Sequence, residues 1–360
     1  MNNNNKSRRH YQRMYYPILS HYINSGWNNG NKSRRHILHC KLLVAKFPRR
    51  QHPRRRTALG QRSGQPLIAI AKFGIGRTAG SHHPRAAHQP EDLVDSDVLG
   101  GRAYYLGRVA NDLYGRHYKE DMQACGVGFS GAGNGSSTTG TCVVLVSPDS
   151  ERTMLTHLGA SSLLQPDNID KTIIKDAGMV YIEGYLWTGE RTRNAALKLA
   201  AIAQQNKIPV AFTLSDAFVV NSFKNQLIDF IRWNVDILFC NDIEAMAMAE
   251  TSDIQEAFEV LKGMAETIFI TRGENGSWAF NPTEEKIIVA IFPTKAVDAT
   301  GAGDLYAAGA LYGIIRSYSL KESAIIGSYC ASKVVSHMGG RMPVDSNLDI
   351  KKIIGEYKKL

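Results

Sequence analysis

Carboxylates are missing from the first quarter of the chain. Residues 1–90 contain 18 Lys and Arg and no Asp or Glu, so the formal net charge of +10 is spread unevenly. The rest of the chain holds 25 basic and 33 acidic residues, and eight of the eleven histidines lie before residue 91. Ninety residues without one carboxylate are hard to reconcile with a globular domain. We therefore consider the two parts separately.

Long apolar runs and paired cysteines are also absent. No apolar stretch approaches the 18 residues of a membrane span, so we expect no membrane partner. The cysteines are five in number, and no two of them form a C-x-x-C motif. This usage favours a reducing compartment without disulfides or a zinc site, and we expect a cytoplasmic protein. The cysteines are Cys40, Cys125, Cys142, Cys240 and Cys330.

The basic segment, residues 1–96, allows three interpretations. It opens with an Asn run, and the hexapeptide Asn5 to His10 recurs as Asn31 to His36. A basic, disordered arm is one interpretation, and it is the only argument for a nucleic-acid partner, which we do not expect. A transit peptide is the second. We favour the third, a frame-disrupted extension that forms no native part of the core.

From residue 97 the pattern changes to short apolar strands that alternate with helices of ten or more residues. This alternation predicts a parallel sheet covered on both faces. A Val-rich hairpin over residues 138–159 stands apart from the alternation. Ligands of such sheets bind beyond the carboxyl ends of the strands. We expect strands at 99–110, 179–182, 210–214, 236–240 and 267–271, with helices at 111–124, 190–206, 222–233, 242–250 and 254–264.

The segment Val297 to Asp304 (VDATGAGD) carries the strongest chemical signal. Small residues precede a helix that we expect to begin near Asp304, with the amides of Ala302, Gly303 and Asp304 open to an anion. A carboxylate beside an anion pocket suits a general base that accepts a hydroxyl proton. The alternative is an Asp N-cap after a Gly turn.

The same segment, D-x-T-G-A-G-D, resembles the C-terminal signature of the ribokinase-like (PfkB) family of carbohydrate and purine kinases. The resemblance implies that Asp304 is the catalytic base and that Gly301, Ala302 and Gly303 form the anion hole. It also implies that Asp298 and Thr300 help to bind a monovalent cation such as K⁺. Ala299 stands where the family commonly has Thr.

A second polar motif follows the strand expected at 236–240. One helical turn places Asn241 and Glu244 on the same face, where Glu244 can hold a water on Mg²⁺ and Asn241 a phosphate or metal-bound water. A helix N-cap with a capping-box Glu is the alternative. Because the segment resembles the family's N-x-x-E motif, we favour the functional interpretation.

A third motif follows the next strand. Gly273 and Gly276 permit a tight turn, and the Thr271 hydroxyl can meet a nucleotide phosphate or ribose. The run resembles the family's T-x-G-x-x-G nucleotide loop, which implies ATP and Mg²⁺ as cofactors. The sequence has no G-x-x-x-x-G-K-[ST] motif, which excludes a P-loop kinase.

The resemblance covers residues 99–345 and is greatest to adenosine kinases. It implies a ribokinase-like three-layer α/β sandwich with a mostly parallel central sheet and a small β lid over residues 97–347, followed by a basic tail or helix at 348–360. It further implies ATP-dependent phosphoryl transfer to a hydroxyl of an adenosine-like nucleoside or a sugar, in purine salvage in the former case. We expect a monomer or homodimer.

The family's first strand, with its substrate-binding Asp, and its Gly-Gly-x-x-x-Asn segment have no match in residues 1–98. The alternative function is therefore a disrupted, non-catalytic kinase remnant that at most binds nucleotide. A missing central strand leaves unpaired backbone groups in the sheet, so we expect residues 91–360 to be marginally stable. The segment Pro66 to Ala71 is the candidate to fill the gap.

Overall fold

The computed structural model describes residues 102–124, 127–129, 131, 137–146, 152–342 and 349–359, together with four short strands nearer the N-terminus. The chain divides into residues Met1–Arg34 and Arg35–Leu360, and the description concerns the second unit. The four N-terminal strands are β1 (Arg35–His39), β2 (Lys41–Val44), β3 (Leu67–Ile70) and β4 (Gly74–Gly76).

The carboxyl-terminal half of the main sheet is parallel, as the alternating pattern predicts. Neighbouring strands pair in register from β9 to β12, and an antiparallel hairpin, which the sequence pattern did not predict, completes that edge. The strands in this half are β9 (Val180–Glu183), β10 (Val210–Thr213), β11 (Ile237–Asn241), β12 (Thr267–Thr271), β13 (Ser277–Asn281) and β14 (Glu284–Val289).

The other half of the main sheet departs from the expectation for residues 1–96. Strand β2 fills the place between β9 and β5 (Arg102–Gly107) and runs antiparallel to both. Strand β3, inside the segment Pro66 to Ala71, pairs with β5 and not in that gap. Strand β6 (Gly128–Phe129) also pairs with β5. Two strands of the basic segment thus join the sheet that we expected to lack a strand.

A second, four-stranded sheet corresponds to the expected β lid. Its order is β4-β1-β7-β8, built around the hairpin of β7 (Thr141–Val146) and β8 (Arg152–His157). The base of this hairpin is fixed by Asp112, whose carboxylate accepts hydrogen bonds from the Thr139 amide at 2.8 Å and the Gly115 amide at 2.8 Å. The lid therefore starts from an anchored position.

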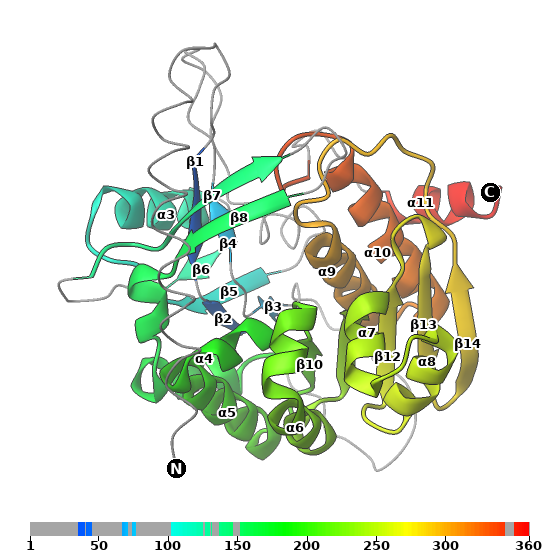
Figure 1. Ribbon diagram of the computed structural model, residues 1–360, viewed down its shortest axis with the longest axis horizontal. Coiled ribbons are helices and arrows are strands. Elements are labelled where there is room, and N and C mark those ends of the chain that lie inside the picture. Colours follow the sequence, from blue (N-terminus) through cyan, green and yellow to red (C-terminus); the bar gives the residue numbers. More distant parts are fainter. Residues whose placement is uncertain are drawn as a thin grey trace, which may run out of the picture. The chain divides into compact units, whose positions relative to one another are not determined.

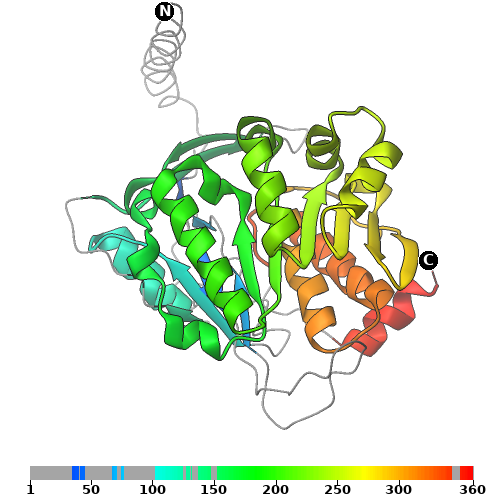
Figure 2. The same ribbon diagram turned by 90° about the horizontal axis from the view of Figure 1, so that it is seen from below.

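Helices cover both faces of the main sheet, as Figures 1 and 2 show, with α4 to α8 on one side and α9 to α11 on the other. Helix α6 begins five residues before its predicted start because Asp216 caps it and accepts from the Phe218 amide. The helices are α3 (Leu113–Ala124), α4 (Lys171–Lys175), α5 (Glu190–Gln205), α6 (Ala217–Asn234), α7 (Asp242–Ala249), α8 (Ile254–Lys262), α9 (Ala302–Ile315), α10 (Leu320–Val335) and α11 (Ile350–Tyr357).

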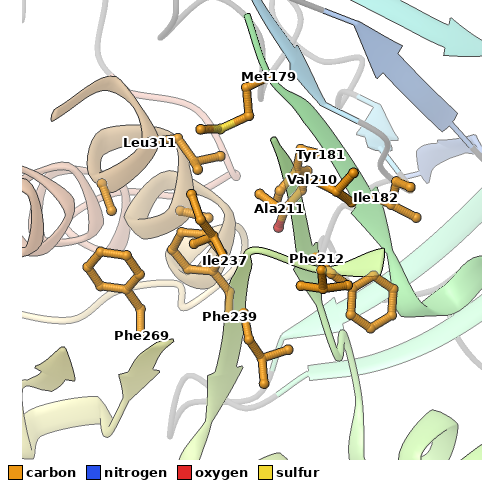
Figure 3. Close-up of a cluster of buried hydrophobic side chains, with 14 of the residues drawn as sticks. Met179, Tyr181, Ile182, Val210, Ala211, Phe212, Ile237, Phe239, Phe269 and Leu311 are labelled. Carbon is orange, nitrogen blue, oxygen red and sulfur yellow. The ribbon is translucent and has the colours of Figure 1, made fainter. Parts of the chain in front are cut away.

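The core lies on both faces of the parallel strands, against α9 on one face and against α5 and α6 on the other. Figure 3 shows side chains of β9 to β12, among them Phe212 and Phe239, together with Leu311 of α9. The rings of Phe239 and Phe269 stack with their centroids 4.9 Å apart. No helix in the described parts of the chain has both the length and the apolar character needed to cross a membrane.

Candidate active site

Polar side chains gather where the parallel strands end. Asn241 closes β11 and lies opposite Thr271, which closes β12. Glu183 closes β9 and lies opposite Thr213 of β10. Because these strands run in the same direction, their carboxyl ends form one edge of the sheet, and the sequence-predicted residues Asn241 and Thr271 are direct neighbours there.

Asn241 and Glu244 form the capping box that the alternative interpretation describes. The Asn241 side chain accepts from the Glu244 amide at 2.7 Å, and the Asn241 amide donates to Glu244 Oε2 at 3.1 Å. Burial, together with the nearby carboxylates of Asp216 and Asp304, raises the pKa of Glu244 to about 7. Burial and these neighbouring carboxylates therefore favour the protonated form of this acid.

Asp304 is not the N-cap of its helix. Helix α9 begins at Ala302, two residues earlier than predicted, and Gly301 is the N-cap, so Asp304 lies within the first turn. This corrects the alternative interpretation of an Asp N-cap. The negative charge of Asp304 contributes to the raised pKa values of Tyr181 and Glu244, in each case after burial as the main cause. The charge of Asp304 therefore affects residues of the same edge of the sheet, where β9 and β11 end.

The two glycines before Asp304 lie in different surroundings. Gly301 has a φ of +79°, and a Cβ there would lie 2.7 Å from the Gly340 carbonyl oxygen, so only glycine fits. Gly303 is exposed, and a Cβ there would meet no atom within 4 Å. The Ala302 amide donates to the Ala299 carbonyl at 3.3 Å, which corrects our expectation that it is open to an anion.

Asp298 and Thr300 bind each other. Asp298 is only 2% exposed, and its Oδ1 accepts from both the amide and the hydroxyl of Thr300. Its Oδ2 accepts from the Gly339 amide at 2.9 Å. These hydrogen bonds connect Asp298 to Thr300 within the loop and attach the loop to Gly339. A role of Asp298 and Thr300 in binding K⁺ stays a prediction, and the described residues contain no group of three or more His, Cys, Asp or Glu side chains that could hold a metal ion.

The loop after β12 is shaped by Gly276. This residue has a φ of +78°, and a Cβ there would lie 2.1 Å from the Val289 carbonyl oxygen. Gly273 is exposed and borders open space, since a Cβ there would meet nothing within 4 Å. The Thr271 hydroxyl lies 3.5 Å from the Cys240 carbonyl oxygen. The loop therefore leaves open space next to Gly273, two residues after Thr271.

Three residues at this edge were assigned no role from the sequence. Glu183 is buried with 3% exposure, and the Tyr185 hydroxyl donates to Asp216 Oδ2 at 3.3 Å. Burial and the carboxylates of Asp216 and Glu183 raise the pKa of Tyr185. Their position at the end of β9 and within three residues of the ends of β9 and β10 was the available signal. Their side-chain proximity depends on strand order, which the sequence pattern does not give.

Solved structures share this architecture. An adenosine kinase from Sinorhizobium meliloti is 32% identical, with a TM-score of 0.69, and the match covers 81% of this chain and 84% of that one. A protein from E. coli, solved with ATP and Mg²⁺, is 19% identical with a TM-score of 0.66 and matches over 89% of this chain and 98% of its own, which supports the fold alone. The fold is thus that of the ribokinase-like phosphotransferases.

Sequence comparison leads to the same class. The model of the pfkB family of carbohydrate kinases matches residues 96–347, so the chain belongs to this family of kinases. A 5-dehydro-2-deoxygluconokinase from Shouchella clausii is 26% identical over 273 residues, which are 73% of this chain and 84% of that protein. The relatives thus include kinases of a nucleoside and of a sugar acid.

Proposed function

We propose that this chain transfers the terminal phosphoryl group of ATP to a hydroxyl of an adenosine-like nucleoside or of a sugar, with Asp304 as the general base. The observation that carries the proposal is the position of Asp304 in the first turn of α9, directly after Gly301 to Gly303. The helix dipole and the amides of that turn favour negative charge, while the carboxylate accepts the acceptor's proton.

Two exposed glycines leave space in which the phosphates of a nucleotide can lie. Gly303 and Gly273 each border a space that a single methyl group would begin to fill. Phosphate oxygens can approach backbone amides closely at such positions. We assign Thr271, Gly273 and Gly276 to nucleotide binding, and the amides of Gly301, Ala302 and Gly303 to the anion hole, with Ala302 requiring release of its bond to Ala299.

Glu244 and Asn241 fit a Mg²⁺ ion held through water. A buried carboxylate with a raised pKa gains from a nearby cation, and carboxylate and amide oxygens suit this ion. Bound Mg²⁺ would neutralise charge on the phosphates. In its absence the capping box with Asn241 keeps the Glu244 side chain at the end of β11. The residues thus combine a structural role with a candidate ligand role.

A panel of acceptors tests the proposal. Purified full-length protein is incubated with labelled ATP, Mg²⁺ and adenosine, ribose, 2-keto-3-deoxygluconate, 5-dehydro-2-deoxygluconate or a sugar phosphate. We expect phosphorylation of a primary hydroxyl, with adenosine as the preferred acceptor. No labelled product from any acceptor at saturating ATP would overturn the proposal.

A non-catalytic remnant is the second candidate, and one observation favours it. The place between β9 and β5 is filled by β2 (Lys41–Val44), which runs antiparallel and contains no carboxylate. The family resemblance leads us to expect a substrate-binding Asp on a strand of this region. Nucleotide binding by calorimetry without turnover of any acceptor would support the remnant, and measurable turnover would exclude it.

A further inference from the structure

A buried ion pair links two segments that are 220 residues apart in the sequence. Arg341 Nη2 lies 2.9 Å from Asp121 Oδ2, and the two side chains are only 15% and 8% exposed. Asp121 belongs to α3 next to Met122, which is 1% exposed, whereas Arg341 follows α10. The pair therefore joins α3 to the segment that follows α10.

The segment 339–341 supports the loop that carries Asp304. The Gly339 amide donates to Asp298 Oδ2 at 2.9 Å. The Gly340 backbone lies so close to Gly301 that a Cβ on Gly301 would come within 2.7 Å of its carbonyl oxygen. The start of α9 thus rests on two consecutive residues, and the next residue, Arg341, is the one held by Asp121.

Helix α3 is itself fixed to the base of the lid hairpin. Asp112, directly before α3, accepts from the Gly115 amide and from the Thr139 amide and hydroxyl, the last at 2.6 Å. Although partial burial opposes ionisation, the hydrogen bonds from Thr139 and Gly115 keep the pKa of Asp112 below its usual value. Contacts thus connect the base of the lid hairpin, through α3, to the segment 339–341 that supports the loop carrying Asp304.

We propose that Asp121 and Arg341 are positioning residues that fix the loop 298–304, and with it Asp304, relative to α3 and the base of the lid hairpin. The inference rests on the proposed function, because it assigns the pair to the placement of Asp304. A buried ion pair is a poor device for stability alone, since desolvation of the two charges offsets most of their attraction. The fork-shaped guanidinium of Arg341 instead fixes the direction of its contact with Asp121, which the ammonium group of a lysine would not do.

Two variants separate positioning from stability. Arg341→Met leaves the Asp121 charge buried and should lower both stability and kcat. The double variant Asp121→Leu with Arg341→Met removes both charges and should regain stability in urea denaturation. We expect its kcat to remain about 10- to 100-fold below wild type and KM for ATP to rise as well, because the displaced loop carries both Asp304 and the amides assigned to the phosphates. Arg341→Lys should give an intermediate kcat.

A control and a second readout complete the test. Ile174→Ala in α4, at a fully buried position, should lower stability without lowering kcat. Hydrogen exchange of the hydrogen-bonded amides of Thr300, Ala302 and Leu305, measured without substrate, should quicken in the double variant while that of β13 does not. Wild-type kcat together with wild-type exchange at these three amides in the double variant would overturn the inference. An inactive wild type would instead refute the proposed function, and the exchange measurement would still decide the role of the pair.

Discussion

The two halves of the main sheet differ in how much of their structure follows from local sequence. From β9 to β12 each strand is parallel to the next and ends in a polar residue, and helices connect them. On the other side of β9, the strand β2 comes from the basic segment and runs antiparallel to both neighbours. The candidate phosphate-binding side therefore comes from the alternating strands and helices of the carboxyl-terminal half, whereas the side expected to bind the acceptor includes a strand of the basic segment.

The two parts of the candidate site differ in how many segments of the sequence must come together to form them. The candidate phosphate site needs backbone amides, two tight glycines and a helix start, all within residues 271–304. An acceptor site needs side chains from several distant strands. A chain can therefore keep the first while the second is altered, and the following experiments measure how far the two halves depend on each other.

The largest expected effect is that of Asp304→Asn. The change removes the proton acceptor and keeps the size of the side chain, so kcat should fall by about 10²- to 10⁴-fold while the unfolding free energy stays close to wild type. Steady-state kinetics with the preferred acceptor provide the measurement. Asp349→Asn, at the N-cap of α11, is the matched control and should retain activity. Equal activity in Asp304→Asn and wild type would remove Asp304 as the base.

Gly303→Ala should weaken the binding of ATP without lowering the stability of the protein. The new methyl group meets no protein atom within 4 Å, and alanine in place of glycine stabilises a helix by about 0.5–1 kcal/mol. ATP should nevertheless bind about tenfold more weakly, because the methyl group occupies the space next to the phosphates. Calorimetry measures the affinity. Gly309→Ala, where a Cβ would lie 2.9 Å from Gly327, should show the opposite pattern of lost stability.

Leu43→Pro tests whether β2 belongs to the sheet. Proline lacks the amide that an antiparallel ladder between β5 and β9 requires, so the unfolding free energy should fall by about 1–3 kcal/mol. Urea denaturation supplies the value. Leu43→Val, which keeps the backbone amide, serves as the control and should change the unfolding free energy much less. If the two variants are equally stable, residues 1–96 contribute nothing to the core, as the sequence alone led us to expect.

The smallest expected effect concerns pH and Glu244. Burial raises the pKa of folded Glu244 from 4.5 to about 7, so protonation favours the folded state. Without Mg²⁺ this group therefore contributes stability that is complete below about pH 4.5 and is lost as the pH rises through about 7. Thermal unfolding between pH 5 and 8 should show this loss in wild type and not in Glu244→Gln. Added Mg²⁺ should offset the loss in wild type only, and no offset would argue against Glu244 as a metal site.

Most of the strands and helices followed from sequence periodicity. The expected helix 111–124 corresponds to α3, which begins two residues later at Leu113, and the strand 267–271 coincides with β12. The early start of α6 was missed because the Asp216 cap precedes an apolar run without a clear helical period. The hairpin of β13 and β14 was missed because its strands are interrupted by polar residues. Local signals thus predicted elements well where burial imposed a regular pattern.

The candidate site was predictable only where its residues are close in the sequence. The motif 298–304 and the capping pair of Asn241 and Glu244 are local, and their spacing alone indicated helix starts with polar side chains. The partner of Asp298 is the Gly339 amide, which no spacing rule identifies. Such contacts arise when helix α10 packs beside α9, and packing depends on the whole core.

The amino-acid sequence by itself determined the class of fold, the family resemblance and the chemical character of each motif, because these depend on periodicity and short-range backbone geometry. Only the tertiary structure decided which motifs meet. It placed Asn241 beside Thr271 through strand register and joined Arg341 to Asp121 across 220 residues. It also put β2 in the central sheet, since unpaired backbone groups there must find partners from any segment within reach.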